Sequence, residues 1–263
     1  MKQTGVSMLA IDLSGKIVVV TGATGQLGRV MARTLARCGA DVAVHYHANE
    51  RQADQLVEEI TGLGRRALTV QADVSVETEV LAMRAAVTNA LGAPQIIVNN
   101  AVIQYKWTSV LEQDIADYES QFRSCVLQNV LMAKTFAPAM IKAGYGRIIA
   151  INTECAMQNE PGQSAYVSGK RGMDGVLRVL AKEIGQHAIT VNQVAPGWTI
   201  SDRDRGGRGL LNRLSPYAKK VPLRRRGEDQ EIANVVAFLA SDLASFITGA
   251  YIPVCGGNVM PGI

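Results

Sequence analysis

Apolar strand-like runs alternate with helical patterns along almost the whole chain, and this alternation limits the possible folds more than any other feature. The strand-like runs are Lys16–Val20, Asp41–Tyr46, Ala67–Asp73, Gln95–Ala101, Arg147–Asn152, Ala188–Ala195 and Tyr251–Val254. Helical patterns lie between them, including Gln52–Leu63, Val76–Leu91, Asp117–Ala143, Ser164–Gly185 and Asp229–Leu239. Because each strand is reached through a helix, the sequence predicts an α/β fold, a doubly wound sheet of seven mainly parallel strands with helices on both faces.

A glycine-rich turn follows the first of these strands. Lys16–Val20 runs directly into Thr21–Gly28, and apolar residues from Val30 to Ala36 then recur with helical period. A strand, a glycine-rich turn and a helix form the place where a dinucleotide pyrophosphate lies against free backbone N–H groups and the helix dipole. The sequence therefore predicts a Rossmann-type dinucleotide-binding site at this turn.

Length and composition agree with one large globular unit. The 263 residues are 48% hydrophobic, and no repeat, low-complexity block or linker divides them, so a single domain over residues 1–263 is expected. No apolar stretch approaches the roughly 18 residues of a membrane span, and no continuous apolar core marks a secretory signal. The four cysteines are scattered, which predicts reduced thiols in the cytoplasm, and the three histidines form no metal-ligand pattern, so no metal is expected.

Tyr166 and Lys170 lie four residues apart within the predicted helix Ser164–Gly185. Side chains at this spacing share one helix face, so an ammonium group would lie beside a phenol. A positive charge favours the phenolate and lowers the pKa of the tyrosine, which predicts that Tyr166 donates or accepts a proton during catalysis.

Together these features resemble the short-chain dehydrogenase/reductase family. The likeness extends from about Leu13 to the C-terminus and includes Thr21–Gly28, Asn99–Ala101, Tyr166–Lys170, Pro196–Gly197, Phe246–Gly249 and Gly256–Gly257. Within the family the chain is similar to the 3-oxoacyl-carrier-protein reductases and their alcohol or sugar dehydrogenase relatives. The resemblance implies an oxidoreductase that transfers a hydride between a nicotinamide dinucleotide and a carbonyl or secondary alcohol carbon.

The resemblance also implies the catalytic residues. Tyr166 would protonate the developing alkoxide in reduction, and Lys170 would lower its pKa and hold the nicotinamide ribose. The family serine that binds the substrate carbonyl corresponds to Thr153, which has the same hydroxyl chemistry. The family asparagine of a water-linked proton relay corresponds to Cys125, a weaker hydrogen-bond partner, rather than to Asn129 one turn later.

Cofactor contacts are implied in the loops that follow the strands. The residues concerned are Gly22, Thr24, Gln26, Leu27, Gly28, Tyr46, His47, Asp73, Val74, Asn99, Ala101, Tyr166, Lys170, Pro196, Gly197, Thr199 and Ser201. Two positions depart from the family pattern, because Gln26 replaces the middle glycine of the turn and Val102 replaces a glycine after Asn99–Ala101. The Gln26 side chain would either shift the turn or take part in binding.

The end of the second strand bears on the choice of cofactor. NAD-binding proteins usually have an acidic residue there that accepts hydrogen bonds from the ribose hydroxyls. Tyr46 occupies that position, and His47 and Asn49 could donate to a 2′-phosphate. The sequence therefore favours NADP(H), with NAD(H) possible.

A strongly basic segment coincides with the family's substrate lid, at about residues 200–226. From Arg203 to Arg226 there are nine basic residues and one acid, a net charge of +8, so with a total of +4 the remaining chain carries −4. Such a lid would attract anionic substrates or acyl thioesters, or it is a solvated loop with no substrate role. Nucleic acid is a poor alternative, because no aromatic interleaving accompanies the charge.

Two other functions stay open at this point. The substitutions at Thr153, Cys125 and Gln26 are compatible with a dinucleotide-binding sensor or scaffold with little catalysis, and a bound nicotinamide could also serve an isomerase-like or dehalogenase-like reaction. A homotetramer is expected from the family resemblance, with the helices at Asp117–Ala143 and Ser164–Gly185 pairing across one interface.

Overall fold

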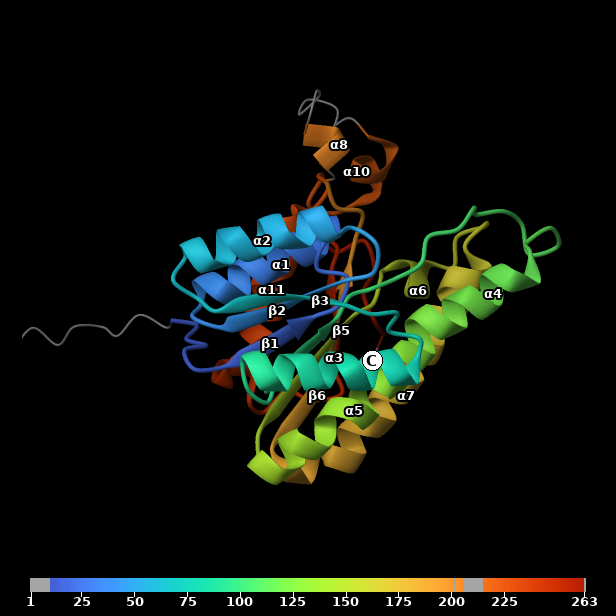
Figure 1. Cartoon of the computed structure of the whole chain (residues 1–263). Coiled ribbons are helices and arrows are strands. Elements are labelled where there is room, and N and C mark those ends of the chain that lie inside the picture. The colour runs from blue at the N-terminus through green and yellow to red at the C-terminus, as the bar shows by residue number, and fades with distance from the viewer. Residues whose placement is uncertain (1–9, 201, 206–214, 263) are drawn as a thin grey trace, which may run out of the picture.

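Seven parallel strands form one central sheet in the computed structural model, which describes residues 10–200, 202–205 and 215–262 (Figure 1). The strands are β1 (Ile17–Val20), β2 (Asp41–Tyr46), β3 (Ala67–Gln71), β4 (Ile96–Asn99), β5 (Gly146–Ile151), β6 (Ile189–Pro196) and β7 (Tyr251–Val254). Their order across the sheet is β3-β2-β1-β4-β5-β6-β7, and every pairing between neighbours is parallel. The predicted doubly wound α/β fold is therefore confirmed, and its strand order reverses between β1 and β4, where such sheets bind ligands.

Helices connect the strands and cover both faces of the sheet. The long helices are α1 (Gln26–Arg37), α2 (Glu50–Gly62), α3 (Glu77–Ala90), α5 (Gln128–Ala143), α7 (Ser164–Ile184) and α11 (Asp229–Ala240). Shorter ones are α4 (Ile115–Gln121), α6 (Cys155–Gln158), α8 (Asp202–Arg205) and α10 (Pro216–Lys220), together with the 3₁₀ turns η2 (Gly185–His187) and η3 (Asp242–Ala244).

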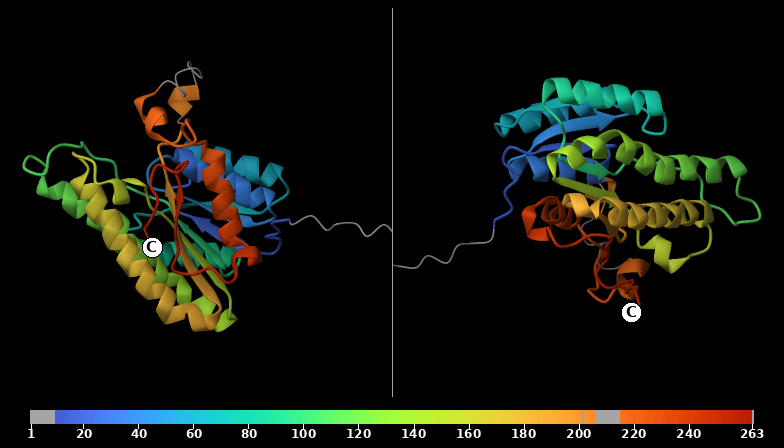
Figure 2. Two further views of the ribbon diagram at one scale, coloured as in Figure 1. Left: turned by 180° about the vertical axis from the view of Figure 1, so that it is seen from behind. Right: turned by 90° about the horizontal axis from the view of Figure 1, so that it is seen from below.

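Two hydrophobic cores lie on opposite faces of the sheet because alternate strand residues point to opposite sides. Val18 and Val20 of β1 pack with α1, α2 and α11, whereas Ile17 and Val19 pack with α3, α5 and α7. Seen from behind, the orange-red α11 lies beside the blue α1 (Figure 2). The near-continuous apolar strands of the sequence are explained by this burial on both faces.

One predicted helix is interrupted. The segment Asp117–Ala143 was expected to be a single helix, but a π-helical turn, η1 (Phe122–Leu127), separates α4 from α5. A π turn places one extra residue in the helical path, and such turns are frequent at functional sites. Cys125 lies within it.

Two groups of elements project beyond the sheet. One consists of the loop before α4 with α4 and α6, and the other of α8 and α10 (Figure 1). The loops that follow the carboxyl ends of β4, β5 and β6 lead into these projections. No helix in the described ranges is long and apolar enough to cross a membrane.

Candidate active site

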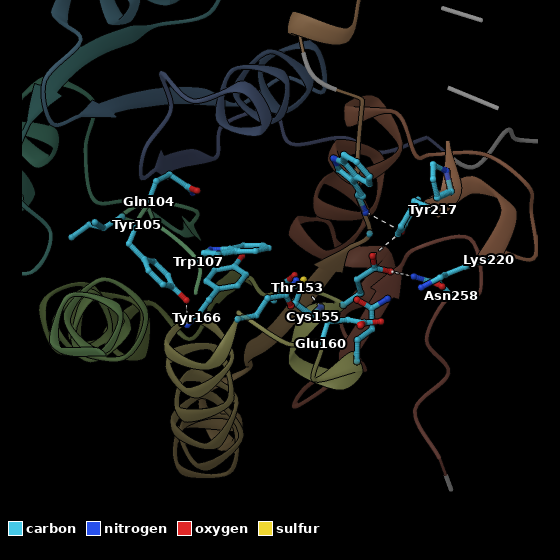
Figure 3. Close-up of a pocket in the computed structure, with 17 residues that line it drawn as sticks. Gln104, Tyr105, Trp107, Thr153, Cys155, Glu160, Tyr166, Tyr217, Lys220 and Asn258 are labelled. Atoms are coloured by element: carbon cyan, nitrogen blue, oxygen red, sulfur yellow. Dashed lines mark hydrogen bonds between the residues drawn. The ribbon is translucent and has the colours of Figure 1, made fainter. Parts of the chain in front are cut away.

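A cavity of about 610 Å³ lies where the two projections face each other across the strand ends (Figure 3). Its walls come from the loop after β4, the segment after β5, the start of α7, the segment after β6, α10 and the C-terminal segment. The lining residues are Ile103, Gln104, Tyr105, Trp107, Thr153, Glu154, Cys155, Gln158, Glu160, Gln163, Tyr166, Gly197, Trp198, Pro216, Tyr217, Lys220 and Asn258. Five aromatic rings therefore surround a small number of polar groups, which is the usual composition of a small-molecule site.

Tyr166 lies in the first turn of α7 and lines this cavity. Its backbone N–H donates to the Tyr105 hydroxyl at 2.7 Å, and its ring stacks against Trp107 with a centroid separation of 6.0 Å. Figure 3 shows Trp107 against Tyr166, on the side of the cavity away from Tyr217 and Asn258. The loop after β4 therefore fixes the position of the ring.

Lys170 lies one turn further along α7 and is buried. Its Nζ donates to the Ile151 carbonyl at 2.6 Å and lies 5.7 Å from the centre of the Tyr166 ring. The predicted lowering of the Tyr166 pKa by Lys170 is wrong for this structure, because burial raises the pKa of Tyr166, although a hydrogen bond from Thr153 acts in the opposite direction. Burial also lowers the pKa of Lys170 itself.

Thr153 lies just beyond the end of β5 and is buried at the floor of the cavity. Its Oγ1 accepts from the backbone N–H of Cys155 at 3.2 Å, and its carbonyl accepts from the Tyr251 hydroxyl at 2.6 Å. Thr153 and Tyr166 therefore line the same cavity, and hydrogen bonds to the hydroxyl and to the carbonyl of Thr153 hold the threonine in place.

Cys125 lies on η1 and Asn129 at the start of α5. The Cys125 Sγ is fully buried and lies 3.9 Å from Oε1 of Gln121, a weak contact. The Asn129 amide donates to the Cys125 carbonyl at 2.7 Å, and its oxygen accepts from the Asn99 side chain at 2.7 Å. Asn129 therefore joins the π turn to the end of β4.

The glycine-rich turn has the geometry of an anion-binding site. Gly22 has a positive φ of 59°, and a Cβ there would lie 2.9 Å from the Cα of Ala101. A Cβ on Gly28 would overlap the Gly22 carbonyl oxygen and lie 2.8 Å from the Cα of Ala23. The N-terminal turn of α1 contains no acidic residue and no side-chain cap, so its N–H groups and dipole are available to a phosphate.

A second cavity, of about 560 Å³, begins at this turn. It is lined by Gly22, Thr24, Gly25, Gln26, Leu27, His45, His47, Ala48, Asn49, Ala72, Asp73, Val74, Ser75, Asn100, Ala101, Val102, Ile103, Gln104 and Ser124. Ile103 and Gln104 also line the first cavity, so the two are contiguous. The two contiguous cavities, one beginning at the glycine turn and the other lined by Tyr166, together fit an extended dinucleotide.

The predicted cofactor residues differ in where they lie relative to the two cavities. Gly22, Thr24, Gln26, Leu27, His47, Asp73, Val74 and Ala101 line the second cavity, and Gly197 and Tyr166 line the first. Gly28, Asn99, Lys170, Pro196 and Thr199 lie in the surrounding segments without lining either cavity, and Ser201 lies outside the described residues. Tyr46 belongs to the hydrophobic core, and its hydroxyl donates to Glu50 at 3.3 Å, so its side chain is turned away from the second cavity.

Gln26, the residue in place of a glycine, connects the turn to the start of the predicted lid segment. Its side-chain amide donates to the carbonyl of Ile200. Nearby, Arg29 of α1 pairs with Asp202 of α8. The substituted position therefore helps to hold the base of the lid over the start of α1.

The described part of the predicted lid segment, residues 200–226, carries less uncompensated positive charge than the sequence suggested. Arg205 pairs with Asp229 at 2.7 Å, Arg225 with Glu231 at 2.5 Å, and Arg226 with Asp204 at 2.8 Å. Two of these carboxylates, Asp229 and Glu231, follow Arg226 in the sequence and were not counted with the basic segment. The count therefore overestimated the net positive charge of this region. Among the described residues that line the first cavity, Lys220 is the one cation, and the described residues contain no cluster that could hold a metal.

His45 is a site residue for which the sequence predicted no role. Its Nδ1 accepts from the backbone N–H of Gly22 at 2.9 Å, and its Nε2 lies 2.9 Å from the Ala72 carbonyl, to which it donates. The imidazole is therefore neutral, with its proton on Nε2, and it supports the glycine turn from within the sheet. Burial lowers the pKa of His45 from 6.5 to about 4.

This lowered pKa predicts a loss of stability in mild acid. Below pH 6.5 the unfolded chain binds a proton at His45 that the folded chain does not bind until about pH 4, so the free energy of unfolding falls across this window by about 3 kcal/mol. Urea unfolding of the wild type and of His45→Asn between pH 8 and pH 4 measures the effect. The difference in the free energy of unfolding between the wild type and His45→Asn should shrink as the pH falls. A difference that does not change with pH would contradict a neutral buried imidazole.

Comparison with known proteins places this site among dinucleotide-dependent enzymes. A family model described as enoyl-(acyl carrier protein) reductase matches residues 22–258. The 3-oxoacyl-(acyl-carrier-protein) reductase FabG of Staphylococcus epidermidis is 35% identical over 93% of this chain and 99% of its own length. The Pseudomonas aeruginosa protein of the same name is 34% identical over 95% of this chain and 100% of its own.

Solved structures agree with these relatives. A 7α-hydroxysteroid dehydrogenase in complex with NADH and 7-oxo glycochenodeoxycholic acid superposes with a TM-score of 0.87 at 30% identity, covering 95% of this chain and 97% of that one. The reductase LugOII, described as promiscuous and active in keto-reduction, superposes with a TM-score of 0.84 at 31% identity, covering 94% and 99%.

Proposed function

Because this chain belongs to the short-chain dehydrogenase/reductase family, we propose that it is an oxidoreductase that transfers a hydride between NADP(H) and a carbonyl or secondary alcohol carbon. The observation that carries this proposal is the placement of Thr153 and Tyr166 together in the wall of one cavity, contiguous with a second cavity that begins at the glycine turn. A sensor or scaffold would not need a proton donor in a cavity contiguous with the one at the glycine turn.

The residues of the chain handle the proton and the oxygen, while the bound dinucleotide supplies or accepts the hydride. The Thr153 hydroxyl donates a hydrogen bond to the carbonyl oxygen and stabilises the charge that develops there. Tyr166 then gives its phenolic proton to that oxygen. Burial raises the pKa of Tyr166, which keeps the phenol protonated at neutral pH, as reduction requires.

Lys170 and Cys125 lie behind the proton donor. Lys170 Nζ is held against the Ile151 carbonyl at 2.6 Å, 5.7 Å from the centre of the Tyr166 ring, and we propose that it binds the ribose and restores the proton of Tyr166 once the dinucleotide is bound. The Cys125 thiol is a poor relay partner, so we propose that this chain resupplies the proton by a route other than the side chain at this position.

The preference for NADP(H) rests on the end of β2. His47 and Asn49 line the second cavity there, and Tyr46, in the usual acidic position, is turned into the core. A 2′-phosphate would therefore meet hydrogen-bond donors from the end of β2, and Asp73, the one carboxylate among the described lining of this cavity, follows β3 instead.

Steady-state oxidation of NADPH and NADH tests the proposal directly. The substrate panel contains 3-oxoacyl thioesters, suggested by the named relatives, together with cyclic ketones and keto sugars. We expect turnover with at least one carbonyl and a higher kcat/KM with NADPH than with NADH. Tight dinucleotide binding without turnover of any carbonyl would instead favour the sensor function.

Thr153 provides a residue-level prediction. Thr153→Ala should lower kcat/KM by about 100-fold, because the carbonyl oxygen loses a hydrogen-bond donor in the transition state. Thr153→Ser keeps that donor and should remain within about 5-fold of the wild type, since only a methyl group is lost. The reverse ranking of the two variants, at equal thermal stability, would contradict carbonyl binding by this hydroxyl.

A further inference from the structure

Aromatic surface dominates two opposite sides of the first cavity. The chain has two tryptophans, and both line this cavity while remaining about half exposed. Trp107 stacks on Tyr166, and Trp198 meets Tyr217 edge-on with a centroid separation of 5.5 Å. Exposed aromatic faces beside the proton donor are suited to a flat or cyclic substrate rather than to an extended aliphatic chain.

Glu154 is a carboxylate in the same cavity that the proposed reaction does not use. It follows Thr153 directly and is 3% exposed. Its Oε1 accepts from the Tyr217 hydroxyl at 2.7 Å, and its Oε2 accepts from the Asn258 amide at 3.0 Å (Figure 3, where both partners are labelled). Each carboxylate oxygen can accept a further hydrogen bond, so Glu154 can bind a hydroxyl group of a substrate.

The charges around the cavity do not favour an anion. Glu154, Glu160 and Lys220 are the charged residues among its described lining, which gives two acids and one base. Arg225 and Arg226 pair with Glu231 and Asp204 and do not line the cavity, although the Arg226 guanidinium covers one face of the Trp198 ring at 4.4 Å from its centroid. Burial raises the pKa of Glu154, and the hydrogen bonds from Asn258 and Tyr217 oppose this by favouring the ionised form. A substrate with a carboxylate or phosphate close to its carbonyl would have to approach this buried carboxylate, where water screens poorly.

We infer that the cavity selects neutral, cyclic carbonyl compounds that carry a hydroxyl group, and that Glu154 is the specificity-determining residue that binds this hydroxyl and excludes anions. The inference rests on the proposed hydride transfer and names the substrate class of that site. The tryptophan faces hold the ring, Thr153 and Tyr166 take the carbonyl oxygen, and Glu154 takes the hydroxyl at the far side.

A matched series of cyclohexanones tests this substrate class. With NADPH saturating, kcat/KM is measured for cyclohexanone, for its 3- and 4-hydroxy derivatives, for 4-oxocyclohexanecarboxylate and for a linear 3-oxoacyl thioester. For the wild type, kcat/KM should be about 10-fold higher with the better hydroxy derivative than with cyclohexanone, which corresponds to one favourable hydrogen bond. With the carboxylate it should be at least about 10-fold lower than with cyclohexanone. The linear thioester should have a lower kcat/KM than the hydroxy derivative.

Glu154→Gln should remove both preferences. It keeps the shape of the side chain but not the charge, so the carboxylate should improve about 10-fold relative to cyclohexanone, which serves as the internal measure of catalytic competence. Glu160→Gln is the matched control, because it removes the same charge from an exposed position where water screens it, and it should shift the ratios much less.

A binding measurement on the wild type keeps the inference testable if Glu154→Gln does not fold. Because both tryptophans line the cavity, their fluorescence should report occupancy by 1,4-cyclohexanediol in the presence of NADP⁺, and 4-hydroxycyclohexanecarboxylate should bind at least 10-fold more weakly. Turnover of ketones with the carboxylate preferred would overturn the substrate class alone. Absence of turnover with every ketone and thioester would overturn the proposed function and the substrate class with it.

Discussion

Replacing Tyr166 with phenylalanine is expected to lower kcat for carbonyl reduction by about 10²- to 10⁴-fold, the usual contribution of a positioned general acid. The substitution removes one hydroxyl and leaves the ring, so the stacking against Trp107 and the N–H bond to Tyr105 should persist. The dissociation constant of NADPH, measured by fluorescence, should therefore stay within about 2-fold of the wild type, while kcat falls.

The pH dependence of the wild type provides a second readout of the same residue. Because burial raises the pKa of Tyr166, the phenol stays protonated through neutral pH, and the rate of reduction should be flat there. Alcohol oxidation needs the phenolate, so its rate should rise with pH over the same range. An unchanged kcat in Tyr166→Phe would contradict the assigned role.

Tyr118→Phe is the matched control for the loss of a phenol. Tyr118 lies on α4, and its hydroxyl hydrogen-bonds Ser164 at the start of α7 with a separation of 2.7 Å, but it does not line the cavity. This variant should lose a tertiary hydrogen bond, about 1 kcal/mol of stability, and keep kcat near the wild-type value.

Gly28→Ala is expected to have the largest effect on cofactor binding. Its new Cβ would overlap the Gly22 carbonyl oxygen and approach the Cα of Ala23 to 2.8 Å, and backbone atoms cannot move aside as a side chain can. Either α1 or the glycine turn must shift, at a cost of about 1–3 kcal/mol. We expect the dissociation constant of NADPH to rise by about 10- to 100-fold, with a lower melting temperature.

Gly62→Ala separates this steric effect from the general effect of a glycine substitution. Gly62 is the last residue of α2, and nothing lies within 4 Å of a Cβ built there. This control should bind NADPH like the wild type and be equally or slightly more stable, because alanine lowers the entropy of the unfolded chain. Wild-type affinity in Gly28→Ala would mean that the turn does not hold the dinucleotide.

The fold was predictable because the apolar periodicity is strong. The bounds of β2 (Asp41–Tyr46) and β7 (Tyr251–Val254) agree with the predicted runs, and the long helices differ by a few residues. The π turn η1 was not predicted, since its single extra residue leaves the apolar pattern of the helix nearly unchanged. The helices α6, α8 and α10 are four or five residues long, too short for any periodicity to show.

The candidate site was predictable only where it depends on local spacing. Thr153 follows a predicted strand, and Tyr166 and Lys170 share a predicted helix. Their places near the carboxyl end of the sheet could therefore be inferred from local patterns. The partners of Glu154 come from 63 and 104 residues further along the chain, at Tyr217 and Asn258, and no local pattern indicates such contacts. An acidic residue three positions after a buried strand was the one signal that could have drawn attention to Glu154.

Transfer of deuterium from labelled cofactor tests the central claim most directly. NADPH deuterated at C4 on one face, and separately on the other, is incubated with the protein and the best ketone of the panel, and the alcohol is analysed by mass spectrometry and NMR. The account predicts deuterium on the carbinol carbon from one of the two labelled cofactors and none from the other. Formation of no alcohol, or of alcohol without deuterium from either cofactor, would contradict hydride transfer at this site.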